Sequence, residues 1–318
     1  YGTSGQTISF GIKENNFGGN ATRLNTSLSI TSSSVKGGFN VIIPNYNYSD
    51  KSLRLNLSRS SNDYLDSSGF KNTITNFTLG TSFEYKQDLF FTPLVVIERE
   101  DLTTNSSASA SLKKQDGNYN NIDLDYSFLY DKRDQSYRPT DGYYSKFNQS
   151  LPLVSNNYTL NNNYDFKTYH RLSDNMISNI SFYISSINSL EGGDVRISDR
   201  IYLSSRRLRG FEPGKVGPKD NQDFIGGNFA SATSISTTLP NVFPELESID
   251  FNIFLDAGNV WGVDYDSSLD NSKIRSSTGL SIDWLTPVGP LNFVIAQPIT
   301  KAGTDVEQSF RFDIGTTF

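Results

Sequence analysis

The 318-residue sequence contains no cysteine, one histidine, one methionine and two tryptophans. Without cysteine the chain can form neither a disulfide framework nor a zinc–thiolate site. Charged residues make up 19% and hydrophobic residues 36% of the chain, and both shares are below those of an ordinary soluble domain. The net charge of −6 and the pI of 4.9 argue against a nucleic-acid-binding protein, which would carry a basic stripe.

Long apolar runs are also missing. A membrane-spanning helix needs about 20 consecutive apolar residues. The longest near-apolar stretch here, Leu89–Ile97, is interrupted by Thr92 and Pro93, and the mean hydropathy is −0.44. These features exclude a helical membrane protein. Disorder is excluded as well, because 17 tyrosines and 22 phenylalanines are spread along the chain.

The sequence does contain an alternation of apolar and polar residues with a period of two. This period predicts β-strands, and helical spacing never lasts for three turns, so the fold is predicted to be all-β. Representative apolar sets of one parity are Ile8, Phe10 and Ile12; Leu53, Leu55 and Leu57; Ile122, Leu124, Tyr126 and Phe128; Ile249, Phe251, Ile253 and Leu255; and Phe310, Phe312, Ile314 and Phe318.

The polar positions between these residues favour a transmembrane antiparallel β-barrel over a soluble sandwich or a propeller. Asn, Ser, Thr, Lys and Asp fill the second face of nearly every segment, as a hydrated lumen requires. A propeller would show a repeat of about 40–50 residues, and none is visible. Aromatic residues stand near segment ends, where the girdles of a barrel belong: Tyr85, Phe90, Phe91, Tyr130, Trp261, Trp284 and Phe318. The sandwich remains the alternative.

One long segment, Glu191–Asn228, interrupts the alternation with glycine, proline and charge. Loops of this length in a compact protein usually serve a function. It contains the run Arg206-Arg207-Leu208-Arg209-Gly210-Phe211-Glu212-Pro213-Gly214.

Arg209-Gly210-Phe211 in a long loop between late strands resembles the signature of the Omp85 superfamily, in particular the barrel of its outer-membrane protein assembly factors. Four further motifs occur in the family's order, and the resemblance is densest from about residue 130 to the end. They are Pro139-Thr-Asp-Gly142, Asp256-Ala-Gly-Asn-Val-Trp261, Thr286-Pro-Val-Gly-Pro-Leu291 with Ala296-Gln-Pro298, and Gln308 to Phe318. Tyr1-Gly2-Thr3 resembles the entry into the first strand.

The resemblance implies one barrel domain over residues 1–318 with sixteen strands, or about 20 residues for each strand and its connection. Residues 191–228 would fold back into the lumen. It also implies periplasmic domains upstream. The sequence begins with neither such a domain nor a secretory signal, so we interpret it as the barrel portion of a longer, exported protein.

The implied activity is non-enzymatic insertion of β-barrel proteins into the outer membrane, through a weak lateral seam and local bilayer thinning. The seam would join the first strand, about Gln6–Lys13, to the last, about Ser309–Phe318. Gly315 could bend the last strand, although a glycine in a strand can simply accommodate packing. The implied seam residues are Gln6, Ile8, Phe10 and Ile12 in the first strand and Phe310, Phe312, Ile314, Gly315 and Phe318 in the last.

The resemblance further implies that Arg209 anchors the loop to acidic residues on lumen-facing strands. Asp256 matches one of these residues. The other aligns at about Ser236, which is not acidic, so the sequence leaves a contact with two carboxylates open. Whether Asp256 faces the lumen depends on whether a bulge at Gly258 shifts the alternation, and this is open too.

The implied partners are unfolded outer-membrane β-barrel clients, assembly-machinery lipoproteins bound through the upstream domains, and outer-membrane lipid and lipopolysaccharide, with no nucleic acid, cofactor or metal. The implied location is the outer membrane of a Gram-negative bacterium. A translocation and assembly relative and a two-partner secretion transporter, which passes a client through its pore, remain alternatives. An imidazole-dependent hydrolase would have to use His170, and no glycine-flanked serine lies near it.

Overall fold

The computed structural model describes residues 7–136, 138–174, 176–240, 248–270, 273–286 and 289–314. Most of them lie in long strands. The strands of the main sheet are β1 (Thr7–Phe17), β2 (Thr22–Thr31), β3 (Ser34–Ile43), β4 (Ser52–Tyr64), β5 (Phe70–Lys86), β6 (Leu89–Thr104), β7 (Gly117–Asp131), β8 (Gly142–Ser155), β9 (Thr159–Ser173), β10 (Met176–Ser189), β13 (Phe229–Pro240), β14 (Ile249–Trp261), β15 (Arg275–Thr286), β16 (Gly289–Thr300) and β17 (Phe310–Ile314).

The remaining elements are short and lie in the connections. They are the helices α1 (Leu65–Ser68) and α2 (Ala110–Lys113), the 3₁₀ turns Tyr46–Tyr48 and Ser267–Leu269, and the two-residue strands β11 (Lys219–Asp220) and β12 (Asp223–Phe224). None of the helices in the described ranges is long and apolar enough to cross a membrane.

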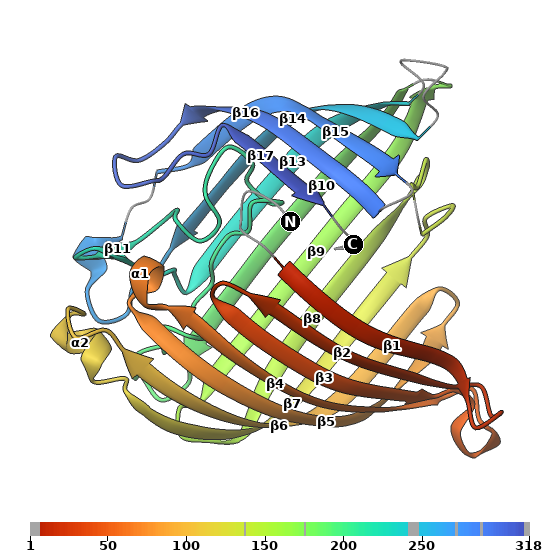
Figure 1. The fold of residues 1–318 in the computed structure, drawn as a ribbon, viewed down its shortest axis with the longest axis horizontal. Coiled ribbons are helices and arrows are strands. Elements are labelled where there is room, and N and C mark those ends of the chain that lie inside the picture. Colours follow the sequence, from red (N-terminus) through yellow and green to blue (C-terminus); the bar gives the residue numbers. More distant parts are fainter. Residues whose placement is uncertain are drawn as a thin grey trace.

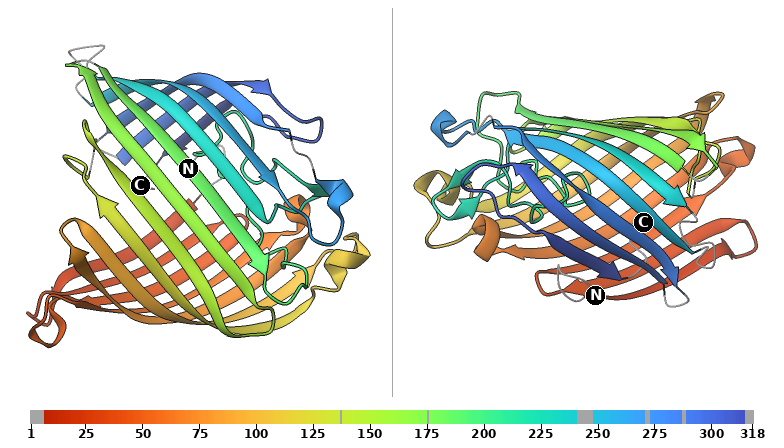
Figure 2. Two further views of the ribbon diagram at one scale, coloured as in Figure 1. Left: turned by 180° about the vertical axis from the view of Figure 1, so that it is seen from behind. Right: turned by 90° about the horizontal axis from the view of Figure 1, so that it is seen from above.

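The main sheet follows the chain order from β1 to β10 and from β13 to β17, and all of its strand pairs are antiparallel. It curves into a barrel, and Figures 1 and 2 show β1 and β17, the two ends of the strand order, on the same side of it. The predicted antiparallel β-barrel is therefore confirmed. The described residues give a 15-stranded sheet, whereas the resemblance implied sixteen strands.

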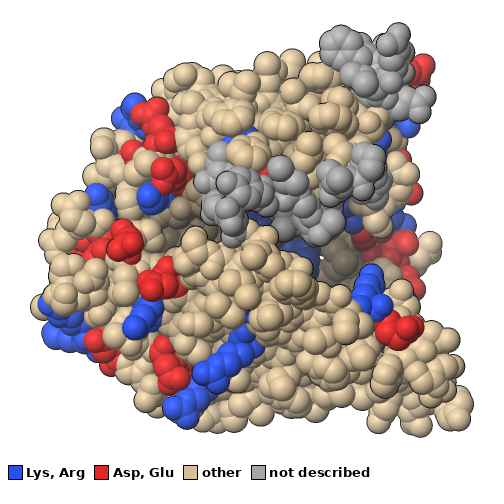
Figure 3. Space-filling model, viewed as in Figure 1, with Lys and Arg blue, Asp and Glu red and all other residues tan. Residues whose placement is uncertain are grey.

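The apolar face of the sheet points outward. In β14, Ile253 and Leu255 are 50% and 47% exposed, whereas Phe254 and Asp256 between and beyond them are 2% and 0% exposed. This is the consequence of successive side chains pointing to opposite faces of a strand. Figure 3 shows charged side chains mainly at the two ends of the barrel, with a largely uncharged surface between them.

The two ends of the barrel are built differently. We call the end where β10 ends and β13 begins the loop end, and the opposite end the turn end. At the loop end, α1, α2 and the β11–β12 hairpin lie together (Figure 1). Here a small hydrophobic core joins the ends of β5 and β6 to the connections and to the lumen loop, which thereby cover the loop end. Its buried members are Phe70, Leu102, Ala108, Leu112, Ile197, Ile225 and Val263.

Candidate functional site

Residues 190–228, which we call the lumen loop, leave β10 at the loop end and pass inside the barrel before returning to β13 (Figure 2). The prediction that residues 191–228 fold back into the lumen is thus confirmed. The loop packs tightly against the wall at Gly210, whose φ is +88°. A Cβ atom there would lie 3.2 Å from Cβ of Ser277 and 3.3 Å from Cβ of Ala296. The positive φ therefore favours glycine, and an added Cβ would require Ser277 and Ala296 to shift.

Arg209, next to this glycine, forms a bidentate ion pair with Asp256. Its Nε donates to Oδ2 of Asp256 at 2.7 Å and its Nη2 donates to Oδ1 at 2.6 Å. The backbone N–H of Arg209 also donates to Oδ2, at 3.0 Å. The Asp256 side chain is 0% exposed and that of Arg209 is 17% exposed. Removing one partner would leave a buried charge unpaired, which is why such pairs are costly to break.

Asp256 reaches the lumen by plain alternation. The register between β13 and β14 runs without a shift from Phe229 opposite Trp261 to Pro240 opposite Asp250, so no bulge at Gly258 is needed. This register also identifies the other polar partner of Arg209. Nη2 of Arg209 donates to Oγ of Ser234 at 2.9 Å, and Ser234 stands directly opposite Asp256.

The second partner of Arg209 is therefore Ser234, two residues before Ser236, the position at about which the family's second acidic residue aligns. Oγ of Ser236 instead accepts a hydrogen bond from Nδ2 of Asn179 on β10, at 2.9 Å. The contact of Arg209 consists of one carboxylate, one hydroxyl and one aromatic ring, because its guanidinium lies over Phe254 with 3.5 Å between Cζ and the ring centroid.

Two further arginines hold the lumen loop to other parts of the wall. Arg207 forms an ion pair with Asp165 of β9 at 2.7 Å and lies over the ring of Tyr183 of β10. Arg196 is buried against Glu100 of β6, with 3.3 Å between Nη1 and Oε2. Sequence reasoning missed both arginines. Asp165 and Glu100 occupy polar positions in the alternation of their strands, which places both carboxylates on the lumen face. This pattern could have identified them as partners for arginines of the loop.

The two end strands of the sheet are the second part of the site. Outward-facing Ile8, Phe10 and Ile12 of β1 are 54%, 64% and 72% exposed. β1 extends to Phe17, beyond the expected Lys13. β17 pairs with β16 over Phe310–Ile314 opposite Leu291–Ile295, including Phe312 opposite Phe293. The predicted seam residues Gln6, Gly315 and Phe318, and the side chain of Ile314, lie outside the described residues.

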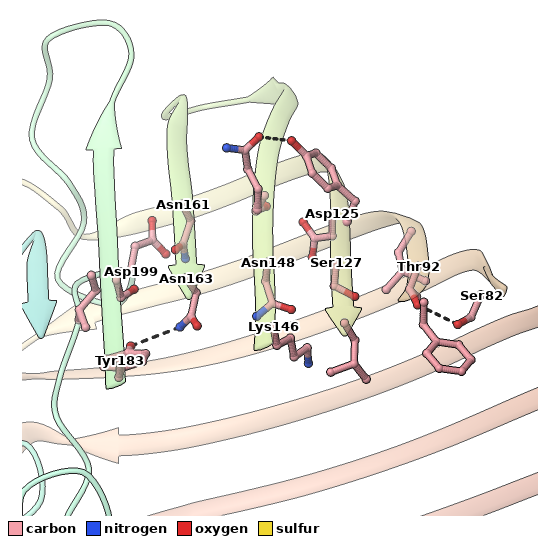
Figure 4. Close-up of a pocket in the computed structure, with 18 of the residues that line it drawn as sticks. Ser82, Thr92, Asp125, Ser127, Lys146, Asn148, Asn161, Asn163, Tyr183 and Asp199 are labelled. Atoms are coloured by element: carbon pink, nitrogen blue, oxygen red, sulfur yellow. Dashed lines mark hydrogen bonds between the residues drawn. The ribbon is translucent and has the colours of Figure 1, made fainter. Parts of the chain in front are cut away.

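Between the lumen loop and the wall formed by β4–β10 lies a polar cavity of about 920 Å³. Its walls carry amide, hydroxyl and charged groups that face one another across the lumen (Figure 4). Asn163 donates to the hydroxyl of Tyr183 at 3.3 Å, and the hydroxyls of Ser82 and Thr92 lie 2.8 Å apart. This polar lining agrees with the hydrated lumen that the polar residues at alternate strand positions predicted.

Near the loop end, the β11–β12 hairpin carries two carboxyl groups that contact the outer connections. Oδ2 of Asp220 accepts hydrogen bonds from Oγ of Ser109 at 2.5 Å and from the hydroxyl of Tyr265 at 2.9 Å. Burial, followed by the hydrogen bond to Asp220, raises the pKa of Tyr265. Burial, followed by the charge of Asp220, raises the pKa of Asp223, and Lys219 opposes this shift. Both shifts disfavour the ionised forms of these two side chains at the hairpin.

Candidate groups for catalysis or metal binding are sparse. His170 is exposed in β9, and its Nδ1 lies 3.7 Å from Oδ1 of Asp141. Among the residues that the structure describes, no group of three or more His, Cys, Asp or Glu side chains could hold a metal ion.

A curved antiparallel sheet with an apolar outer face and a loop anchored in a polar lumen defines a β-barrel of the outer-membrane type. The family described as the Omp85 superfamily domain matches residues 16–318, and the chain belongs to this family.

Individual relatives cover parts of the chain. "Outer membrane protein assembly factor BamA" of Neisseria meningitidis serogroup B is 30% identical over 139 residues, which are 35% of this chain and 17% of that protein. "SAM50-like protein SPAC17C9.06" of Schizosaccharomyces pombe is 28% identical over 231 residues, 66% of this chain and 47% of that protein. The chain thus spans less than half the length of either relative.

The similarity in fold extends over nearly the whole chain. The crystal structure of BamA from Haemophilus ducreyi lacking POTRA domains 1–3 superposes with a TM-score of 0.87 at 22% identity. It covers 98% of this chain and 68% of that one. At this identity the likeness concerns the fold alone.

Proposed function

We propose that residues 1–318 form the barrel domain of an outer-membrane assembly factor that inserts unfolded β-barrel clients without covalent chemistry. The observation that carries this proposal is an internal loop fixed by the buried Arg209–Asp256 pair, inside a barrel whose end strands β1 and β17 lie on the same side.

The physical problem of insertion is the unpaired backbone. Each unsatisfied N–H or C=O group in hydrocarbon costs several kcal/mol. A strand at the edge of a sheet presents a row of such groups and can pair with an incoming strand. In our proposal β1 and β17 form a lateral seam, and the edge exposed when it opens templates the client's terminal strand. Local bilayer thinning around the seam would lower the barrier further.

The lumen loop supports this activity as an anchored element. Arg209 would fix the loop on β14, while Gly210 and Phe211 allow tight packing of the loop against the wall. Phe211 is 1% exposed, so a direct contact with clients is not the role we assign to it. The function of the motif is to hold the inside of the barrel in one arrangement while the seam opens.

The partners follow from the same proposal. The clients are unfolded outer-membrane β-barrel proteins, the surroundings are outer-membrane lipid and lipopolysaccharide, and accessory lipoproteins would bind through periplasmic domains. The location is the outer membrane. A bacterial outer membrane is our proposal, and the SAM50-like relative in a yeast makes the mitochondrial outer membrane the alternative.

The test is client assembly by the full protein reconstituted in liposomes, measured as the appearance of heat-modifiable, folded client on gels. We expect Arg209→Ala to reduce the assembly rate about tenfold or more, because it leaves the carboxylate of Asp256 buried and unpaired. The matched control is Arg206→Ala, which removes an exposed arginine of the same loop. Equal rates for both variants and the unaltered protein would contradict the anchoring role.

The polar cavity favours one second candidate, a two-partner secretion pore, because a hydrated lumen could conduct. Ion conductance of the purified protein in planar bilayers separates the two. An assembly factor with an anchored lumen loop should conduct little in its resting state, whereas a steady large conductance would support the pore.

A further inference from the structure

The connection between β16 and β17 (residues 301–309) is joined to the lumen loop by main-chain hydrogen bonds. The N–H of Glu212 donates to the carbonyl of Val306 at 2.9 Å, and the N–H of Val306 donates to the carbonyl of Lys215 at 3.1 Å. The N–H of Gln308 donates to the carbonyl of Gly210 at 3.0 Å. Phe211 and Glu307 form an antiparallel β-bridge between these bonds. The two segments therefore pair like short strands.

This pairing lies directly before the last strand. The carbonyl of Ser309 accepts from the N–H of Ala296 at 2.8 Å, and β17 begins at the next residue. Within β17, Nη1 of Arg311 donates to Oγ of Ser205 in the lumen loop. The lumen loop thus contacts both the residues that lead into β17 and β17 itself.

A buried ion pair fixes the same connection to the wall. Nε and Nη2 of Arg275, the first residue of β15, donate to Oδ2 and Oδ1 of Asp305 at 2.9 and 3.0 Å. Both side chains are 0% exposed. Nη1 of Arg275 also donates to Oδ1 of Asn259 at 2.5 Å and to the carbonyl of Lys273 at 2.8 Å. Asp305 additionally accepts from the N–H of Ala302 at 2.6 Å.

We propose that residues 209–215 and 305–309 form a clasp that sets the register of β17, with Arg275 and Asp305 as its positioning residues. The clasp makes the lumen loop and the last strand one mechanical unit. β17 cannot slide along β16 without breaking main-chain bonds to the loop that Arg209 anchors.

The position of β17 at the end of the strand order explains what such a device does. Among the described residues, β16 is the strand that pairs with β17, whereas β15 and β16 each pair on both sides. A strand held by one ladder can slip by two residues, a shift that keeps every side chain on its own face. One consequence, that the edge of β17 is placed correctly for the seam, rests on the proposed function. The inference that the clasp sets the register of β17 does not depend on that function.

The test measures the register of β17 by disulfide trapping, which is clean because the chain has no cysteine. Ile295→Cys with Phe310→Cys reports the native register, because these residues stand opposite each other on the outer face. Ile295→Cys with Phe312→Cys reports a slip of two residues. Asp305→Asn breaks the buried pair, and Glu307→Gln is the matched control, since the side chain of Glu307 pairs with Lys301 at the surface of the same connection.

We expect Asp305→Asn to lower the ratio of native to slipped crosslink about tenfold, as loss of a buried charge partner should, and Glu307→Gln to leave it unchanged. An unchanged ratio in folded Asp305→Asn protein, or an equal fall in the control, would overturn the clasp. This readout requires no client, so failure of the proposed assembly function would leave it interpretable.

A second measurement covers the case in which Asp305→Asn does not fold. Glu212 and Val306 stand opposite each other in the clasp. The pair Glu212→Cys with Val306→Cys should oxidise nearly completely under mild conditions and leave assembly at the rate of the reduced protein. Poor crosslinking would contradict the clasp. Loss of assembly on oxidation with recovery on reduction would show that the two segments must separate, and would overturn the mechanical unit.

Discussion

The guanidinium of Arg209 lies over the ring of Phe254, with 3.5 Å between Cζ and the ring centroid, while Asp256 on the same strand accepts hydrogen bonds from its Nε and Nη2. Phe254 and Asp256 are two residues apart and therefore share the lumen face of β14. The anchor thus depends on a planar, forked cation rather than on positive charge alone.

This geometry predicts that Arg209→Lys is not a conservative change. An ammonium group can neither bond Asp256 through two parallel N–H groups nor stack over Phe254. We expect a loss of about 2–4 kcal/mol of stability, close to that of Arg209→Ala. The measurement is the temperature at which the folded gel band disappears. Arg206→Lys is the control. If Arg209→Lys lost its folded band at the same temperature as the unaltered protein, the role of the two parallel N–H groups of Arg209 would be refuted.

The hydroxyl of Ser234, rather than that of Ser236, should hold the lumen loop. Ser234→Ala removes the bond to Arg209, whereas Ser236→Ala removes a bond to Asn179 within the wall. Each loss should reduce stability by about 0.5–1.5 kcal/mol. Only Ser234→Ala should speed protease cleavage within residues 190–228. Equal cleavage rates would contradict the assignment.

Gly279 makes room for the ring beneath Arg209. A Cβ at this position would overlap the carbonyl oxygen of Ile295 and lie 2.8 Å from Cζ of Phe254. Gly279→Ala should therefore destabilise the barrel by about 1–3 kcal/mol. Gly303→Ala is a matched control, because nothing lies within 4 Å of its added methyl group. A thermal midpoint of Gly279→Ala equal to that of Gly303→Ala would contradict the prediction that Ile295 and Phe254 leave no room for a side chain at position 279.

The alternation of the sequence was sufficient to predict the barrel and the outward face of β14, because a period of two depends only on local chain geometry. Arg209 and Asp256 were identified separately, through the motifs of the family. The partnership of Ser234 could not be predicted, since it depends on the register of two strands and on where the loop tip lies. The Arg275–Asp305 pair could not be predicted from the sequence either. These residues lie 30 positions apart, and Asp305 stands in a connection without alternation.

Docking of the β11–β12 hairpin should strengthen in acid. The pKa of Asp223 is raised in the folded protein by burial and by the charge of Asp220. A raised carboxyl pKa favours the protonated form, so stability falls as pH rises from the ordinary value of 3.8 through the folded value. Asp223→Asn removes this dependence. At neutral pH it should raise the thermal midpoint followed by tryptophan fluorescence, and the gain should vanish below about pH 4. A variant that is less stable at neutral pH would contradict the sign.

The lateral seam is tested most directly by linking its two strands. Cysteine pairs placed along Thr7–Ile12 of β1 and Phe310–Phe312 of β17 can be scanned in a chain that has no other cysteine, and the pair that oxidises most completely is then assayed for client assembly. The account predicts that assembly stops when the two strands are joined and returns on reduction, while the folded barrel persists throughout. Undiminished assembly by the fully crosslinked protein would contradict lateral opening.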